Sequence, residues 1–295
     1  MNIRLDEILV KMIEMDAADV NITEKLEISY RVGKDIVKIP QSYVSNSNIH
    51  TILLDLTGSD QVIMDLYKPQ EIDGSYKFVY NNSVYYFRYN ISLTIRNVHI
   101  SIRKLINKIP SFESIDLNDS KIRPLIDDML QVREGLYLIV GATGSGKSTT
   151  IVTLLDHILQ QKRVKTITLE SPIEFYFDNN RYDSSVVIQK EIGRDTESFY
   201  KGVVAAMRQN PDILFVGEVR DKDTAIACMN AALTGHMVIA TLHAKSIEKT
   251  KDRISYLLED ITNDIDFING IIYQKLVKDK DRGVKAIRDV YINNN

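Results

Sequence analysis

Apolar residues near the start of the chain recur at the spacing of a helix. Leu5, Ile8, Leu9, Met12 and Ile13 fall on one face of a 3.6-residue period, and charged residues lie between them. One face of such a helix is suited to burial and the other to water. The pattern therefore predicts an opening amphipathic helix that packs on a sheet.

The spacing then changes to the two-residue alternation of strands, interrupted by one helical stretch. The predicted elements are strands at 20–22, 28–32 and 36–37, a helix over 50–66, a hairpin of 76–80 and 84–92, and a strand at 97–105. Asn81-Asn82-Ser83 forms the predicted hairpin turn. Residues 1–105 are therefore predicted to form a small α+β domain.

Residues 106–120 keep no sustained period. The stretch holds Pro110, Ser111 and Ser114, which favour turns and loops. We interpret it as a linker that leads into a helix over 124–132, and the remaining residues, 121–295, as a second domain.

In the second domain, short apolar runs alternate with helical stretches. The runs are 136–140, 166–169, 213–216 and 238–242. This order is typical of an α/β fold with a mostly parallel sheet. The 295-residue length agrees with two domains.

Composition narrows the function classes. With 37 Lys+Arg against 40 Asp+Glu, the net charge of -3 gives no electrostatic reason to expect nucleic acid as the main partner. Cys228 is the only cysteine, which excludes a disulfide framework and a tetracysteine zinc site and favours a reducing cytoplasm. Neither a membrane-spanning run nor a signal peptide is predicted.

The strongest chemical signal is the run Gly141-Ala142-Thr143-Gly144-Ser145-Gly146-Lys147-Ser148, which fits the phosphate-loop pattern G-x-x-x-x-G-K-[ST]. It lies between a predicted strand and an amphipathic helix that starts at Thr149. Glycines let backbone N–H groups turn toward phosphate oxygens, and the helix N-terminus adds partial positive charge. Lys147 is expected to contact the β- and γ-phosphates of ATP, and the Ser148 hydroxyl is expected to bind Mg²⁺.

Two acidic residues follow predicted core strands. Glu170 is placed to orient or deprotonate a water, although a glutamate at a strand end is more often a solvated cap. Glu218 ends a Walker B-like run and suits either Mg²⁺ or catalysis. His236 and His243 bracket a third strand; a single histidine there is usually structural, but a pair in a phosphate-loop protein favours a functional site.

Four stretches together resemble the secretion and type IV pilus ATPases, also called traffic ATPases. The matching stretches are GATGSGKST, TLESPIEF, MRQNPDILFVGEVRD and TGHMVIATLHA. AADVNI, YRVGKDI, FRYN and SIRK resemble pieces of the PAS-like N-terminal domain of that family. The resemblance implies a RecA-like P-loop core preceded by a PAS-like α+β domain, and an Mg²⁺-dependent ATPase that works as a hexameric motor.

The resemblance also implies roles for single residues. Glu170 would position or activate water, Glu218 would act at Mg²⁺, and His243, supported by His236, would sense the γ-phosphate. Arg88 and Arg103 match arginines presented to nucleotide, in part from a neighbouring subunit, although a surface ion pair is an equal alternative for both. Arg194, Arg208 and Arg220 lie in matched stretches without an assigned role.

The implied setting is the cytoplasm, with peripheral association to the inner membrane through a platform protein of a pilus, secretion or competence system. The layout is closest to the pilus retraction ATPases. Ser171 stands where the family usually has Asp, no AIRNLIRE motif is found, and the chain stops at Tyr291-Ile292, where the family continues into helices, so we expect a truncated or divergent member.

Two alternatives are a RecA-like nucleic-acid translocase and a small-molecule kinase. A translocase would need a basic channel, and we interpret the basic residues near the C-terminus as a solvated face instead. These residues are Lys275, Lys278, Lys280, Arg282, Lys285 and Arg288. Which system is served, whether it assembles or retracts a filament, and the hexamer symmetry stay open.

Overall fold

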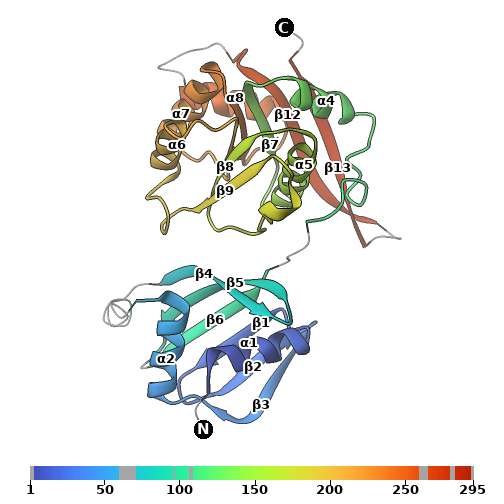
Figure 1. Cartoon of the computed structure of the whole chain (residues 1–295). Coiled ribbons are helices and arrows are strands. Elements are labelled where there is room, and N and C mark those ends of the chain that lie inside the picture. The colour runs from blue at the N-terminus through green and yellow to red at the C-terminus, as the bar shows by residue number, and fades with distance from the viewer. Residues whose placement is uncertain are drawn as a thin grey trace. The chain divides into compact units, whose positions relative to one another are not determined.

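The computed structural model describes residues 3–59, 71–95, 97–105, 109–258, 265–279 and 283–293. The chain divides into two compact units, Met1–Asn107 and Lys108–Asn295 (Figure 1). Within the described residues, no helix combines the length and the apolar character needed to cross a membrane.

The N-terminal unit is an antiparallel sheet covered by helices on one face. Its elements are α1 (Leu5–Glu14), β1 (Asp19–Thr23), β2 (Glu27–Val32), β3 (Asp35–Tyr43), α2 (Asn46–Thr57), β4 (Ile72–Tyr80), β5 (Ser83–Leu93) and β6 (Val98–Lys104). The strand order is β3-β2-β1-β6-β5-β4. Every second residue of β5 and β6, including Phe87, Ile91 and Ile102, enters the same core as the buried face of α1 and α2.

The helix predicted over 50–66 begins earlier, at Asn46. Ser45 caps it through a hydrogen bond from the Asn48 backbone N–H, and Asn48 returns a side-chain contact to the cap. Gly58, with φ 65°, follows its last turn. Residues 60–66 of the predicted helix lie outside the described residues.

The second unit is a seven-stranded sheet with helices on both faces. Its helices are α4 (Arg123–Gln131), α5 (Lys147–Gln161), η1 (Asn179–Arg181), α6 (Phe199–Met207), α7 (Lys222–Leu233) and α8 (Ile247–Leu258). Its strands are β7 (Gly135–Val140), β8 (Lys165–Glu170), β9 (Val186–Glu191), β10 (Ile213–Val216), β11 (Met237–Leu242), β12 (Ile268–Asp279) and β13 (Gly283–Ile292). The predicted α/β fold class is confirmed.

The strand order is β13-β12-β7-β11-β10-β8-β9, parallel except for the edge strand β13. Alternate residues of the central strand β7 enter two cores: Leu136 and Leu138 pack with α6, α7 and α8, whereas Tyr137 and Ile139 pack with α4 and α5. Both faces are thus covered, which explains why the central strands read as continuous apolar runs.

The stretch predicted as a linker packs against the second unit over much of its length. Ile109, Phe112 and Leu117 are buried in the core beside α4 and α5. Phe112 also stacks on His157 of α5, with ring centroids 4.1 Å apart. Residues 109–119 therefore belong to the second unit and do not form a free linker.

One residue of the predicted solvated basic face is not solvated. Lys275, Lys278 and Lys285 are exposed as expected, and Lys280 and Arg282 lie outside the described residues. Arg288, however, is only 7% exposed and makes hydrogen bonds inside the fold. The sequence run of charges did not reveal this, because alternate residues of β13 face opposite sides of the sheet.

Candidate nucleotide-binding site

The sheet brings the predicted site residues to one edge. β7, β11, β10 and β8 are parallel neighbours, so their carboxyl ends lie side by side. The phosphate loop follows β7, Glu170 ends β8, and Glu218 and His243 follow β10 and β11. Four sequence segments that are far apart in the chain thus meet at one place.

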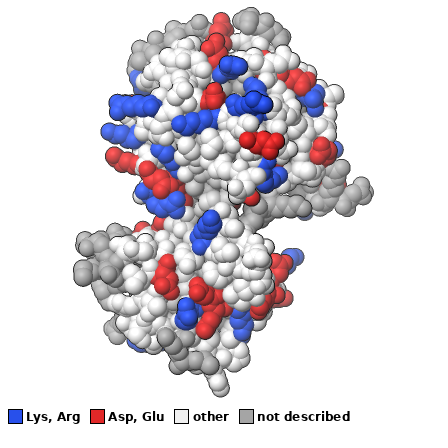
Figure 2. All heavy atoms as spheres, viewed as in Figure 1, with Lys and Arg blue, Asp and Glu red and all other residues white. Residues whose placement is uncertain are grey.

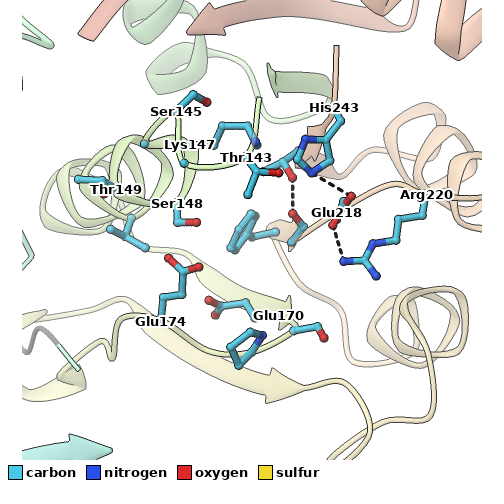
Figure 3. Close-up of a pocket in the computed structure, with 18 of the residues that line it drawn as sticks. Thr143, Ser145, Lys147, Ser148, Thr149, Glu170, Glu174, Glu218, Arg220 and His243 are labelled. Atoms are coloured by element: carbon cyan, nitrogen blue, oxygen red, sulfur yellow. Dashed lines mark hydrogen bonds and ion pairs between the residues drawn. The ribbon is translucent and has the colours of Figure 1, made fainter. Parts of the chain in front are cut away.

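A pocket of about 580 Å³ opens at this edge (Figure 3). Most predicted residues line it: Thr143, Gly144, Ser145, Gly146, Lys147, Ser148, Thr149, Glu170, Glu218 and His243. Glu174 and Arg220 line it as well. Gly141 and Ala142 are not in its lining, but their carbonyl groups contact Lys147.

The phosphate loop has the backbone that its glycines predict. Gly146, with φ 83°, caps the N-terminus of α5, and Gly141 has φ 154°. A Cβ atom at Gly141 would lie 2.2 Å from the carbonyl oxygen of Gln274 on β12. Glycine at 141 therefore lets the loop pass against the neighbouring strand, and the first turn of α5 directs its N–H groups at the pocket.

The Lys147 ammonium group lies over its own loop. Its Nζ donates to the carbonyl oxygens of Gly141 and Ala142, both at 3.0 Å. Burial lowers the pKa of this amine, while Glu218 and Glu174 oppose the shift. Phosphate oxygens offer the same amine charged acceptors in place of two neutral carbonyls.

Glu218 lies between two cationic or ionisable partners. Its carboxylate is 2.6 Å from Arg220 Nη2 and 3.2 Å from His243 Nε2 (Figure 3). The backbone around it is pinned, because the N–H of Gly217 donates to the Leu169 carbonyl at 2.7 Å and the N–H of Val219 donates to the Thr241 carbonyl at 2.9 Å. The side chain is thereby held at the centre of the pocket edge.

Glu170 is the buried carboxyl group of the site. It is 6% exposed, accepts a hydrogen bond from Thr168 Oγ1 at 2.6 Å and another from Gln189 Nε2 at 3.2 Å. Burial raises its pKa to about 7, and the nearby carboxylates of Glu174 and Glu191 add to the shift, against the two hydrogen bonds. A carboxyl group with this pKa can exchange a proton near neutral pH, as an acid–base catalyst must.

His236 lies elsewhere, which corrects the expectation that it supports His243 at the nucleotide. It directly precedes β11, whereas His243 follows that strand, so the two are separated by roughly 20 Å at about 3.3 Å per residue. Its Nδ1 is 3.2 Å from the Ala231 carbonyl oxygen, and it lines a different pocket with Arg133 and Lys162. A histidine at each end of one strand cannot serve one site.

Arg88 and Arg103 lie on the N-terminal unit, directly opposite each other on β5 and β6. Arg103 Nε donates to Asp19 Oδ1 at 2.6 Å, and Arg88 Nη2 is 3.6 Å from Asp73 Oδ1. The Arg103 side chain is nevertheless 68% exposed. The Arg88–Asp73 pair joins two exposed side chains, whereas Asp19 is itself buried beneath Arg103. A role of either arginine at a nucleotide stays a prediction.

The structure adds two charged residues to the predicted lining of the pocket. Arg220, which had no assigned role, contacts Glu218, and Glu174 lines the pocket opposite Ser148 (Figure 3). The spacing of Arg220, two residues after Glu218, is a signal that could have identified it. Arg194 instead pairs with Asp195 and Glu191, and Arg208 is the C-cap residue that follows α6.

The oxygen donors of the pocket fit Mg²⁺. The Ser148 hydroxyl and the Glu218 carboxylate are hard oxygen ligands in one pocket beside the phosphate loop. Mg²⁺ at nucleotide sites is held by one or two such protein oxygens together with phosphate oxygens and water. Within the described part of the chain, no group of three or more His, Cys, Asp or Glu side chains could hold a metal ion.

Charges on the surface are mixed. On the face drawn in Figure 2, acidic and basic side chains are interspersed within each unit, and the described residues form no continuous basic stripe in that view. A nucleic-acid channel would need such a stripe.

Comparison with known proteins agrees with this geometry. A family model described as "Type II/IV secretion system protein" matches residues 1–291. The type IV pilus retraction ATPase PilT of Pseudomonas aeruginosa is 31% identical over 250 residues, which cover 85% of this chain and 69% of PilT. The competence protein ComGA of Halalkalibacterium halodurans is 34% identical over 171 residues, 58% of this chain and 47% of ComGA.

Two solved structures are similar over nearly the whole chain. The Legionella pneumophila ATPase DotB superposes with a TM-score of 0.86 at 30% identity, covering 98% of this chain and 80% of DotB. The pilus retraction motor PilT with bound ADP superposes with a TM-score of 0.82 at 30% identity, covering 99% of this chain and 84% of that one.

Proposed function

This chain belongs to the Type II/IV secretion system protein family, and we propose that it is an ATP-hydrolysing motor of a pilus, secretion or competence system. The observation that carries the proposal is the meeting of Lys147, Ser148, Glu170, Glu218 and His243 at one pocket. Names of its relatives support it: PilT is a pilus retraction ATPase, and ComGA is a competence protein. The bound ADP in the PilT structure supports nucleotide as the ligand.

In the proposed mechanism, the phosphates of ATP lie against the loop and the N-terminus of α5. Lys147 exchanges its two loop carbonyls for phosphate oxygens, which gives the negative charge a preorganised partner. Ser148 and Glu218 would hold Mg²⁺, which supplies electrostatic stabilisation of the phosphate charge when bound.

Glu170 and His243 have separate roles in hydrolysis. Glu170, with its raised pKa, orients the attacking water and accepts its proton. His243 contacts Glu218 and lines the pocket, so it can respond to the presence or loss of the γ-phosphate. Arg220 keeps the Glu218 carboxylate paired in the geometry described here.

We further propose a homohexamer in which Arg88 and Arg103 of one subunit act at the nucleotide of another. A guanidinium suits the stabilisation of charge on a transferred phosphoryl group. Asp19 holds Arg103 Nε at 2.6 Å and leaves most of the side chain in solvent, so the arginine is presented rather than buried. An inner-membrane platform protein is the proposed partner, and the cytoplasmic side of that membrane the proposed location.

Subunit mixing tests the motor and its ring together. Lys147→Ala subunits keep their arginines, and Arg103→Ala subunits keep an intact phosphate loop. If Arg103 acts across an interface, mixing the two inactive variants should restore ATP turnover above the sum of their separate rates, and wild-type turnover should rise as the protein associates with concentration.

The matched control mixes Lys147→Ala with the double variant Lys147→Ala/Arg103→Ala, in which no subunit has a working loop and no rescue is expected. Sedimentation of the wild type as a monomer with full, concentration-independent turnover would contradict the ring.

The partner is tested by affinity capture from the native cell envelope with tagged wild-type protein. Mass spectrometry is expected to identify an inner-membrane platform protein of a pilus, secretion or competence apparatus. An exposed-site variant, Lys77→Ala on β4, serves as the matched control and should retain capture. Recovery of single-stranded DNA-binding proteins, together with stimulation of ATPase activity by single-stranded DNA, would favour a translocase instead.

A further inference from the structure

A buried polar cluster lies beside the phosphate loop. Gln274 on β12 is 1% exposed and Arg288 on β13 is 7% exposed, and the two are register partners across the hairpin. Thr150 in the first turn of α5, also 1% exposed, completes the cluster. Buried polar side chains of this kind lower stability unless they are hydrogen-bonded.

Gln274 links the loop to the helix that follows it. Its Nε2 donates to the backbone carbonyl of Ser145 at 2.6 Å. Its Oε1 accepts from Thr150 Oγ1 at 2.7 Å and from Arg288 Nε at 2.8 Å. One side chain thus joins the loop, the first turn of α5 and the last strand of the sheet.

The loop fits closely against this residue at both of its ends. A Cβ atom on Gly141 would meet the Gln274 carbonyl oxygen at 2.2 Å, and one on Gly146 would meet Gln274 Nε2 at 2.9 Å. The path of the loop is therefore defined by its contact with Gln274 as well as by its own glycines.

Arg288 extends the links to the segment that precedes the ATP-binding fold. Its Nη1 donates to the backbone carbonyl of Ile115 at 2.9 Å, and its Nη2 donates to Thr150 Oγ1 at 3.3 Å. Ile115 lies in residues 109–119, which follow the N-terminal unit in the chain and pack on α5. A single guanidinium therefore contacts this segment, the helix and, through Gln274, the loop.

We propose that Arg288 and Gln274 are positioning residues that hold the phosphate loop in its nucleotide-binding form and couple it to residues 109–119. The inference rests on the proposed binding of nucleotide at this loop. It assigns neither residue a contact with the nucleotide. Binding that orders the loop would then also order residues 109–119, which follow the N-terminal unit in the sequence.

A purely packing role explains the cluster less well. An apolar pair of similar volume would fill the same space without the desolvation of a buried guanidinium, and such replacements are often neutral or stabilising. What an apolar pair cannot supply is directed hydrogen bonds to the carbonyls of Ser145 and Ile115. A mutation that removes these hydrogen bonds is therefore expected to impair the positioning of the loop independently of its effect on the stability of the fold.

Two variants separate the positioning role from a contribution to stability. Arg288→Met keeps the approximate length of the side chain and removes every donor, so it breaks the link to Ile115 and loosens Gln274. Gln274→Glu keeps the acceptor for Arg288 and Thr150 but places an oxygen against the Ser145 carbonyl, so it breaks only the link to the loop.

The readouts are the dissociation constant of ADP and amide hydrogen exchange, both measured well below the melting temperature. Each variant is expected to weaken ADP binding about tenfold, the size of one lost buried hydrogen bond. Exchange in residues 141–150 should rise in both variants. Exchange in residues 109–117 should rise in Arg288→Met and stay unchanged in Gln274→Glu.

Lys275→Met, which removes an exposed cation from the residue after Gln274, is the matched control and should behave as wild type. ADP affinity within twofold of wild type in both variants would overturn the inference, even with a lowered melting temperature. If Arg288→Met does not fold, the same twofold limit on ADP affinity applies to Gln274→Glu and Arg288→Lys. Failure of the wild type to bind ADP would contradict the proposed function instead.

Discussion

Replacing Lys147 with alanine is expected to lower the rate of ATP hydrolysis by about 10³-fold, the effect of removing a preorganised electrostatic contact from a transition state. The amine already lies in the loop, 3.0 Å from the carbonyls of Gly141 and Ala142, so no rearrangement of the backbone is needed for it to meet phosphate oxygens. A methyl group cannot offset the charge of the β- and γ-phosphates. Phosphate release is the measurement, with ADP affinity as the second.

The control for this variant is Lys201→Ala, which removes an exposed cation from α6, outside the pocket lining, and should keep the wild-type rate. Circular dichroism should show both variants folded, because the Lys147 contacts stabilise two loop carbonyls and no part of either core. Retention of more than about a tenth of the wild-type rate in Lys147→Ala would contradict the role of the amine.

The main site residues were predictable because each one ends or follows a strand of a parallel sheet. Apolar runs at 136–140, 166–169, 213–216 and 238–242 matched β7, β8, β10 and β11 to within one or two residues. The carboxyl ends of parallel strands form one edge, so the residues after these runs had to meet. Local sequence pattern was sufficient to predict these site residues, because each one lies within a few residues of its strand.

Other parts of the site depend on contacts that local pattern does not contain. Thr150 and Gln274 are 124 residues apart in the chain, and Ile115 and Arg288 are 173 apart. Because Arg288 lies in a run of charged residues, the sequence alone predicts a solvated side chain. Its inward position depends on the pairing of β12 with β13, which sets it opposite Gln274. His236 was misplaced for a related reason, since a strand separates its two ends by its whole length.

The packing of residues at the boundary between the units was likewise not predictable from local sequence pattern. Pro110, Ser111 and Ser114 favour loops, and residues 109–119 do form turns rather than a helix or strand. Composition cannot show that Ile109, Phe112 and Leu117 find a core to enter, because that core is built by α4 and α5. Loop propensity and a packed position are compatible when a few apolar side chains anchor the loop.

Replacing either Glu170 or Glu218 with glutamine should lower turnover by at least ~10²-fold and leave nucleotide binding largely intact. Glu218→Gln keeps the shape of the side chain and loses the charge that pairs with Arg220 at 2.6 Å and with His243 at 3.2 Å. Glu170→Gln keeps the shape of the side chain and loses the ability to accept a proton from the attacking water. The rates alone therefore do not distinguish the two roles.

The dependence of turnover on pH distinguishes them. Glu170 acts as a base only when ionised, and burial raises its pKa to about 7, so wild-type turnover should rise as pH increases from 6 to 8. Glu218→Gln should keep this rise at a lower rate, whereas Glu170→Gln should lose it. Normal hydrolysis by Glu170→Gln would leave Glu218 as the only catalytic carboxylate.

Stability gives an independent check on the same carboxyl group. Since the folded-state pKa of Glu170 lies above the ordinary glutamate pKa of 4.5, the native state holds its proton more tightly than the unfolded chain does. The stability that comes from this proton is complete below pH 4.5 and is lost as pH rises through about 7. The melting temperature of the nucleotide-free wild type should therefore fall relative to that of Glu170→Gln between pH 5 and pH 8. Equal pH profiles of melting for the two proteins would show that Glu170 is ionised throughout this range, and would remove it as the base that titrates near neutral pH.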